Sequence, residues 1–294
     1  MIPFSLLEPE SVDEARALLD ADDPSIRLLG GGTALMLLMR SGLFQPQALV
    51  SLRRLAPQYR AISTLDNEVR IGAMASLSSI ERSAAVRSAA PVVSRTMQRL
   101  SNVRVRNVAT IGGHLAHGDP HMDLPAVLTA LNAEITLLGE DGERRMAVES
   151  IYRGYFETNL AATDLIVAVH IPIQGEILAA YMKCTTRSAD DWPALGVAVT
   201  LTIADGAIDS ARVVIGAATD RPTVVDAAAA VLRGTSVAQG AVDAKILREA
   251  GDAVAESITV RADAQGSASY KRELARVYVG RAISAALATG AQGN

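Results

Sequence analysis

The stretch of residues 26–42 constrains the fold of this chain more than any other. It begins as a short apolar strand, IRLLG, passes through consecutive glycines, and becomes an apolar helical segment, ALMLLMRSG. The next apolar stretch, QALVSL, is typical of a second strand. A strand, a glycine loop, a helix and a further strand within about 50 residues favour an α/β arrangement.

The glycine loop itself, LLGGGTAL, is a candidate anion site. Consecutive glycines accept positive φ, so several backbone N–H groups can converge on one anion. A helix that begins near Thr33 adds its N-terminal dipole to that attraction. The spacing fits neither the G-x-G-x-x-G dinucleotide motif nor a P-loop, because no Lys-Ser/Thr follows the glycines. The loop is therefore either a pyrophosphate-binding loop of another kind or a plain tight turn.

A second glycine pair follows 80 positions later, in the stretch TIGGHLAHGDPHMDLP. This stretch holds three of the four histidines, His114, His117 and His121, so a metal site is the competing interpretation. The histidine spacing is not the i, i+4 pair of a metalloprotease helix, and Gly118 and Pro120 interrupt a regular helix. Two glycine loops can instead hold the two phosphates of one dinucleotide from opposite sides, which favours phosphate binding.

Composition excludes several classes of protein and cofactor. The single cysteine, Cys184, rules out an intrachain disulfide framework and predicts a reducing compartment. An iron–sulfur cluster needs about four thiolates, so this chain cannot hold one by itself. A net charge of −4 and 3% aromatic residues do not suit nucleic-acid binding. No apolar run reaches the roughly 18 residues of a membrane span. The N-terminal stretch also lacks the pattern of a signal peptide. We therefore expect a cytoplasmic protein with no membrane span and no nucleic-acid partner.

The pattern of strands and helices divides the chain into regions. Hairpins with turns at residues 66–67 and 141–142 flank a helical region in the middle of the chain. The link IPIQGE, with its proline and glycine, is the predicted domain boundary. After it, two alternating strands are followed by three Ala-rich helices, which suggests an α+β domain. The predicted domains are 1–174, with lobes of about 1–55 and 56–174, and then 175–288.

Several stretches resemble a known protein family: GGGTAL, IGAMASLSSIE, NVATIGGHLAHGDPHMDLPAVLTALNAEITL and YFETNLAATDLIVAVHIP. They are similar to the FAD-binding medium subunit of molybdenum hydroxylases, the family of aerobic carbon monoxide dehydrogenase and xanthine dehydrogenase. The stretches YMKCTTRSADDWPALGVAV and ASYKRELARVYVGRAI resemble the C-terminal domain of those subunits. The resemblance covers nearly the whole chain in the right order, and the paired glycine loops make it specific to the family.

This resemblance implies a fold and a function. The fold is α+β, with a two-lobed FAD-binding domain of the PCMH type followed by a smaller α+β domain of the carbon monoxide dehydrogenase flavoprotein type. The function is electron transfer within a heteromeric oxidoreductase. A large molybdopterin-binding subunit selects and oxidises the substrate, and a small subunit carries electrons through [2Fe–2S] clusters to FAD on this chain. The flavin then reduces an external acceptor. The implied assembly is a dimer of heterotrimers, and this chain contributes no catalytic residue and no metal ligand.

The resemblance also assigns cofactor-binding residues in two groups. The first group would bind the FAD pyrophosphate and comprises Gly30, Gly31, Gly32, Thr33, Ala34, Thr110, Ile111, Gly112, Gly113 and His114. The second group would lie along the ribityl chain and flavin ring and comprises Asp123, Leu165, Ile166, Lys183 and Trp192. His114 stands where relatives commonly have asparagine. We expect its imidazole to titrate near neutrality and to make FAD affinity depend on pH.

Each residue of the second group also has a plainer interpretation. Asp123 could be a buried helix N-cap, and core packing alone would explain Leu165 and Ile166. Lys183 could be an exposed surface lysine instead of a cation beside the flavin. Trp192 could be a core or interface anchor instead of a ring stacked on the isoalloxazine.

Three other functions compete with that of an electron-transfer subunit. The histidine cluster could belong to a metal-dependent hydrolase, which metal analysis of the purified chain would reveal. The chain could be a self-sufficient flavin-dependent oxidoreductase of the same superfamily, which would turn over an organic substrate alone. It could also be a docking subunit whose cofactor loops have decayed, which would show no flavin spectrum after reconstitution.

Overall fold

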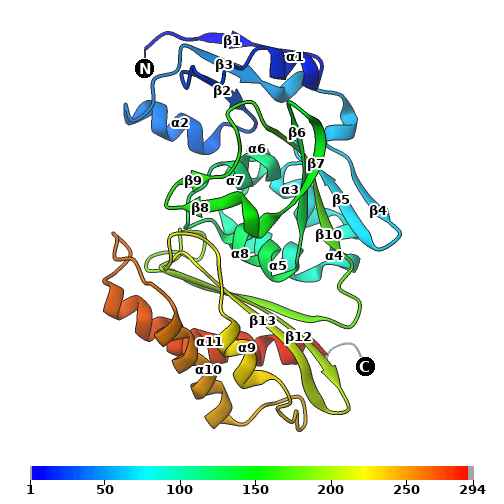
Figure 1. Ribbon diagram of the computed structural model, residues 1–294, viewed down its shortest axis with the longest axis vertical. Coiled ribbons are helices and arrows are strands. Elements are labelled where there is room, and N and C mark those ends of the chain that lie inside the picture. The colour runs from blue at the N-terminus through cyan, green and yellow to red at the C-terminus, as the bar shows by residue number, and fades with distance from the viewer. Residues whose placement is uncertain (1, 291–294) are drawn as a thin grey trace.

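The structure is a computed structural model that describes residues 2–290. Three layers follow one another along the long axis of the molecule (Figure 1). An N-terminal lobe lies at one end, a middle lobe follows it, and the C-terminal part of the chain forms the other end. The arrangement places the first glycine loop where the N-terminal lobe meets the middle lobe.

The N-terminal lobe is a small parallel sheet with two helices. Its elements are β1 (Ser5–Leu7), α1 (Val12–Ala17), β2 (Ile26–Leu29), α2 (Thr33–Arg40) and β3 (Ala48–Ser51), followed by 3₁₀ turns at Leu52–Arg54 and Pro57–Tyr59. The strands pair in the order β1-β3-β2, and both pairings are parallel. Parallel neighbours need crossover connections, which α1 and α2 provide. The predicted strand, glycine loop, helix and strand are therefore confirmed.

The middle lobe combines an antiparallel sheet with a group of short helices. Its sheet has the order β4-β5-β10-β6-β7, formed by β4 (Ile62–Leu65), β5 (Glu68–Gly72), β10 (Leu165–Pro172), β6 (Glu134–Gly139) and β7 (Gly142–Ala147). The helices are α3 (Leu77–Arg82), α4 (Ala84–Ala89), α5 (Pro91–Leu100), α6 (Val103–Val108), α7 (Ile111–Ala116) and α8 (Asp123–Ala130). A 3₁₀ turn (Val148–Ile151) leads into the small hairpin of β8 (Tyr152–Gly154) and β9 (Glu157–Thr158). Both predicted hairpin turns are confirmed, since Leu65 pairs with Glu68 and Gly139 pairs with Gly142.

The C-terminal layer is an antiparallel sheet covered by three helices. Its strands, in sheet order, are β11 (Leu178–Cys184), β12 (Leu195–Ala204), β13 (Ala207–Gly216) and β14 (Thr223–Val224). Its helices are α9 (Asp226–Leu232), α10 (Ala244–Ser257) and α11 (Ala268–Gly290). Two long strands followed by three helices is the order that the sequence predicts for an α+β unit.

Both faces of this C-terminal sheet are buried, which explains why β12 is apolar almost throughout. Val197, Val199 and Ile215 pack toward the helices α10 and α11 in one apolar cluster. Ala198 and Val214 point the other way and join the apolar cluster of the middle lobe, which contains residues of α5 and α8. The middle lobe and the C-terminal layer therefore share a core, and side chains from both can meet along α8.

Candidate functional site

The two glycine loops, 80 positions apart in the sequence, lie in direct contact. A Cβ added to Gly30 would lie 2.8 Å from Thr110 Oγ1, and one added to Gly31 would overlap the Val108 carbonyl oxygen. On the other side of the second loop, a Cβ on Gly112 would lie 2.8 Å from the Cβ of Ala73. Side chains at Gly30 or Gly31 would push the two loops apart, and one at Gly112 would push the second loop away from Ala73, so the glycines allow this close packing.

The first loop presents unused hydrogen-bond donors. Gly32 has φ +73° and precedes the first residue of α2, with no side chain capping the helix. Within residues 2–290, no hydrogen-bond acceptor is found for the N–H groups of Gly30, Gly31, Gly32 or Thr33. Unpaired N–H groups at a helix N-terminus, together with the helix dipole, suit a phosphate. This end of α2 therefore fits the pyrophosphate role predicted for it.

The second loop has a different character, because its own backbone N–H groups are already paired. Ile111 donates to Ala75 O at 3.1 Å, Gly112 to Ala73 O at 2.8 Å, and His114 to Thr110 O at 2.9 Å. The N–H of Gly113 donates to Thr110 Oγ1 at 3.2 Å, so Thr110 is the N-cap of α7. What the second loop can still offer an anion is the hydroxyl hydrogen of Thr110, which lies against Gly30.

His114 is buried beneath this site and lacks a polar partner. Its side chain is only 8% exposed, and its Nε2 has no hydrogen bond within the described part of the chain. Burial, with a smaller contribution from the charge of His117, lowers the pKa of His114 to about 3. The expectation that His114 titrates near neutrality is therefore wrong, because desolvation keeps the imidazole neutral. A buried, unpaired ring nitrogen is also what a residue facing an absent polar ligand presents.

Asp123 and Lys183, expected separately near the flavin, form a buried ion pair with each other. Lys183 Nζ lies 3.2 Å from Asp123 Oδ2, and both side chains are at least 96% buried. Tyr181 Oη donates to Asp123 Oδ1 at 2.7 Å, and Lys183 Nζ also donates to Arg99 O at 3.0 Å. Burial raises the pKa of Asp123 to about 6, although Lys183 and Tyr181 oppose that shift.

These contacts decide between the interpretations of both residues. Lys183 is not an exposed surface lysine, since only 4% of its side chain is accessible. Asp123 is the first residue of α8 and Met122 is its N-cap, so the helix N-cap interpretation of Asp123 is wrong. Tyr181 was missed by the sequence reasoning. Strand alternation could have revealed it, because residues two apart on β11 share a face.

The remaining predicted residues occupy two different environments. Leu165 is 1% exposed and packs in the same apolar cluster as Val50, so core packing accounts for it. Ile166 is half-buried beside an irregularity in the pairing of β10 with β6. Trp192 lies between β11 and β12 and is 46% exposed, so it is not a core residue. Its ring stacks on His121, with centroids 6.2 Å apart and planes inclined by 23°.

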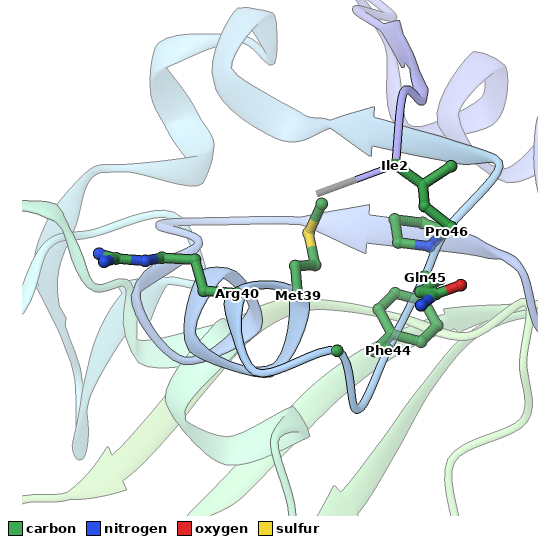
Figure 2. A pocket seen from close by; sticks show the side chains of 7 residues that line it. Ile2, Met39, Arg40, Phe44, Gln45 and Pro46 are labelled. Atoms are coloured by element: carbon green, nitrogen blue, oxygen red, sulfur yellow. The ribbon is translucent and has the colours of Figure 1, made fainter.

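Two cavities lie away from the glycine loops. One cavity of about 250 Å³ lies at the other end of α2, against Met39, Arg40 and Phe44 (Figure 2). A second, of about 260 Å³, lies beyond the C-terminal end of α8, where Asn132, Thr200 and Arg212 contribute to its wall. Neither is lined by a residue of the glycine loops.

Two further structural findings concern metals and membranes. Within residues 2–290, no group of three or more His, Cys, Asp or Glu side chains is arranged to hold a metal ion. His121, which the metal interpretation needed, instead lies between two carboxylates. Among the described helices, none combines the length and the apolar character needed to cross a bilayer.

Comparison with known proteins agrees with the geometry along the whole chain. Residues 2–174 match the family model described as the FAD binding domain in molybdopterin dehydrogenase, and residues 179–286 match the CO dehydrogenase flavoprotein C-terminal domain. The carbon monoxide dehydrogenase medium chain of Afipia carboxidovorans is 31% identical, over 98% of this chain and 99% of that one. The nicotine 6-hydroxylase medium subunit of Paenarthrobacter nicotinovorans is also 31% identical, over 94% of each chain.

A solved structure gives the same answer for the fold. A chain of the carbon monoxide dehydrogenase from Hydrogenophaga pseudoflava, solved without the Mo-pyranopterin moiety of its cofactor, superposes with a TM-score of 0.91. It is 31% identical, with 98% of this chain and 99% of that chain covered. The fold class inferred from the sequence, a two-lobed FAD-binding domain followed by a smaller α+β domain, is thereby confirmed. This chain therefore belongs to the family of FAD-binding medium subunits of molybdenum hydroxylases, and it is an oxidoreductase subunit.

Proposed function

We propose that this chain passes electrons from the [2Fe–2S] clusters of a partner subunit, through its own FAD, to an external acceptor. The observation that carries the proposal is the direct contact between the two glycine loops, which brings two distant segments together at the candidate anion site. The chain has one cysteine, too few to ligate an iron–sulfur cluster, which supports placing the clusters on a partner subunit. A large molybdopterin-binding subunit would oxidise the substrate, and the assembly would be a dimer of heterotrimers. Relatives named as a medium chain or medium subunit support such partners.

Bound FAD would supply the capacity to accept and release electrons, and the protein would supply binding, orientation and electrostatics. The N–H groups of Gly30 to Thr33 would bind the pyrophosphate at the start of α2, where the helix dipole favours negative charge. The Thr110 hydroxyl would add a donor from the second loop, while its oxygen keeps α7 capped. Ala34, Ile111, Gly112 and Gly113 would shape this part of the site by close backbone approach.

Further along the site, the buried side chains would set its polarity. The Nε2 atom of neutral His114 has no hydrogen-bond partner within residues 2–290, and it would bond to a polar group of bound FAD. Lys183, held in place by Asp123 and by the carbonyl of Arg99, would keep a fixed positive charge near the flavin ring. The backbone of Leu165 and Ile166 would line the ring, and Trp192 would exclude water from one side of it.

Reconstitution of the purified chain with FAD tests the binding half of this proposal. We expect about one equivalent of FAD to remain bound through gel filtration, with the absorbance bands of a flavoprotein. Co-purification with a molybdopterin-binding chain and a [2Fe–2S] chain, followed by substrate-dependent bleaching of the flavin, tests the electron-transfer half. A chain that binds no FAD would contradict the proposal. An FAD-loaded chain that turns over an organic substrate alone would support the self-sufficient oxidoreductase instead.

A further inference from the structure

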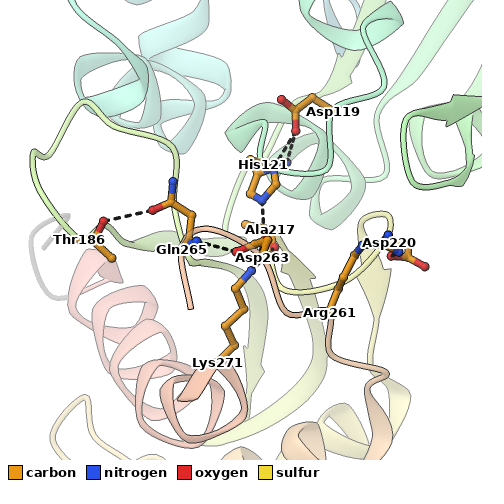
Figure 3. Close-up of polar contacts among 9 residues, drawn as sticks. All are labelled: Asp119, His121, Thr186, Ala217, Asp220, Arg261, Asp263, Gln265 and Lys271. Atoms are coloured by element: carbon orange, nitrogen blue, oxygen red, sulfur yellow. Dashed lines mark hydrogen bonds and ion pairs between the residues drawn. The ribbon is translucent and has the colours of Figure 1, made fainter. Parts of the chain in front are cut away.

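A row of charged side chains outside the glycine loops joins the FAD-binding domain to the C-terminal domain. Figure 3 shows His121 between Asp119, on its own loop, and Asp263, which precedes α11. His121 Nδ1 lies 2.8 Å from Asp119 Oδ1, and His121 Nε2 lies 2.8 Å from Asp263 Oδ2. Asp263 Oδ2 in turn accepts a hydrogen bond from Lys271 Nζ, on α11. We refer to Asp119, His121, Asp263 and Lys271 as the charged row.

Backbone hydrogen bonds beside the charged row also link the two domains. The N–H of Ala217, at the end of β13, donates to Pro120 O at 3.0 Å. The carbonyl of the same Ala217 accepts from Lys271 Nζ at 3.3 Å. Ala217 has φ +64°, a conformation that residues other than glycine seldom adopt, so the surrounding contacts hold it there.

The hydrogen-bond geometry defines the protonation state of His121. An ionised carboxylate only accepts hydrogen bonds, whereas a neutral imidazole has one N–H to donate. His121 contacts a carboxylate with each ring nitrogen, so both contacts are satisfied only when both nitrogens carry a proton. His121 is therefore an imidazolium when Asp119 and Asp263 are ionised.

Charge balance leads to the same conclusion. Lys271 has no exposed surface, Asp119 is 3% exposed and His121 is 8% exposed, so an unpaired charge here would be costly. Two carboxylates and one ammonium leave one negative charge, which an imidazolium neutralises. The groups that face the charged row from its neighbours also agree. Asp119 and Asp263 raise the pKa of His121 above its usual value, despite the opposing effect of burial. Within the charged row, His117, whose own pKa is lowered by burial, affects Asp119, whose pKa it lowers.

Trp192, which the proposed function places beside the flavin, lies against the charged row. Its indole stacks on the His121 ring with centroids 6.2 Å apart, within the range of an offset-stacked ring pair. Trp192 is half-exposed and lies in the loop that joins β11 to β12, where its indole stacks on the His121 ring.

We propose that His121 is a positioning residue, an imidazolium that fixes the indole of Trp192 and joins the FAD-binding loop to the C-terminal domain. The assignment of the indole to the flavin site rests on the proposed function. The charged row and its stacking on Trp192 do not depend on FAD.

Trp192 is the only tryptophan in the chain, so emission excited selectively at the indole, and not at the six tyrosines, reports on the surroundings of this one ring. An imidazolium quenches a stacked indole more strongly than a neutral imidazole does. We expect emission of the full chain without added FAD to rise sigmoidally with pH, with a midpoint above 6.5. H121Q is expected to abolish the sigmoid, and D263N to lower its midpoint by about 1 to 2 pH units through loss of one carboxylate.

The matched control is H117Q, the same substitution in the same loop at a histidine outside the charged row. It should keep the sigmoid and its midpoint. A wild-type midpoint at or below 6.5, or a sigmoid that survives in H121Q, would overturn the proposal. If H121Q does not fold, D263N decides the question, because an unchanged midpoint in that variant equally contradicts the proposal.

A second measurement separates this inference from the proposed function. FAD binding is expected to weaken about fivefold in H121Q and to stay unchanged in H117Q, since a mobile indole covers the flavin less well. Wild-type chain that shows the sigmoid but binds no FAD would contradict the proposed function and leave the charged row intact. Wild-type emission that does not depend on pH, together with normal FAD binding, would contradict the role of His121 and leave the proposed function intact.

Discussion

At the candidate site, two glycines act through the absence of a Cβ atom, and one histidine through the absence of a charge. Gly31 meets the Val108 carbonyl because it has no Cβ, and Gly30 meets Thr110 for the same reason. His114 offers an imidazole that burial has made permanently neutral, so its one proton is fixed on the ring at any physiological pH. FAD affinity is therefore not expected to titrate through His114, contrary to what its position in the sequence suggests.

The Gly31→Ala variant tests the contact between the loops. The added Cβ would overlap the Val108 carbonyl oxygen, a backbone atom that can move only with its loop. We expect FAD affinity to fall at least tenfold, about 1.4 kcal/mol, and the free energy of unfolding to drop by about 1–3 kcal/mol. Flavin absorbance retained after gel filtration measures the first effect, and thermal unfolding measures the second.

Gly280→Ala is the matched control for that variant. Gly280 lies inside α11, and a Cβ there would meet Leu247 Cβ at an ordinary 3.4 Å. The same substitution should leave FAD binding unchanged and leave stability unchanged or slightly higher. Equal FAD affinity in G31A and wild type would show that the loops need not touch.

The sequence predicts the two glycine loops because the backbone freedom of glycine is a property of the residue itself and does not depend on distant contacts. It does not predict the charge state of His114, since the burial that lowers its pKa exists only in the folded chain. Nor does it predict the contact between His121 and Asp263, which are 142 positions apart. The competing interpretation of the histidines as a metal site could not be tested on the sequence either, because Asp263, in a distant segment, is one of the groups that His121 contacts.

Among the elements, β11 and α8 together carry the buried ion pair. Tyr181 and Lys183 alternate onto the face of β11 that meets Asp123 at the start of α8. The long helices α10 and α11 follow from the sequence: α10 has a strong apolar spacing, whereas α11 was predicted from its Ala-rich composition. The strand β11 was not predicted, although the alternation of its residues is visible once the strand is known. The small elements β1, β8 and β9 were not predicted, because two- or three-residue strands are defined by their partners. Which helix β11 faces is likewise a tertiary property.

Lys183→Met should destabilise the junction of β11 with α8, and more so at higher pH. Without the ammonium, the pKa of Asp123 rises beyond about 6, so ionising this buried carboxyl becomes more costly. We expect a loss of about 3 kcal/mol near pH 8 and a smaller loss near pH 5.5, where the carboxyl accepts a proton. Chemical denaturation at both pH values measures the difference.

Two further variants serve as controls for the stability loss in K183M. K183M/D123N removes the uncompensated carboxylate and should be more stable than K183M near pH 8. Arg187→Met breaks an exposed ion pair with Asp191 and is expected to cost less than about 0.5 kcal/mol. A K183M loss that is independent of pH would mean that packing, and not the charge of Asp123, explains it.

At the scale of the whole molecule, the junction between the FAD-binding and C-terminal domains has an apolar and a charged part. The apolar part is the shared core, in which Ala198 and Val214 of the C-terminal sheet pack with residues of the middle lobe. The charged part is the row from Asp119 to Lys271. A junction of this kind should make the two domains unfold together, and the charged row should make that unfolding depend on pH.

The sign of this pH dependence follows from the shifts within the charged row. Asp119 and Asp263 have lowered pKa values, so the stability they contribute is present above about 3.8 and is lost as the pH falls. His121 has a raised pKa, so its contribution is fully present below about 6.5 and is lost as the pH rises through its folded value. All three groups therefore stabilise the fold together between those two limits.

The difference in unfolding free energy between wild type and H121Q isolates the histidine part of this dependence. We expect about 2 kcal/mol near pH 5.5, a value typical of hydrogen bonds to charged groups, and a steady decline above pH 6.5. Urea denaturation at a series of pH values measures it, with H117Q as the reference for a neighbouring histidine. A difference that grows with pH would mean that His121 is neutral in the folded protein. The two carboxylates would then need another positive charge to hold the domains together.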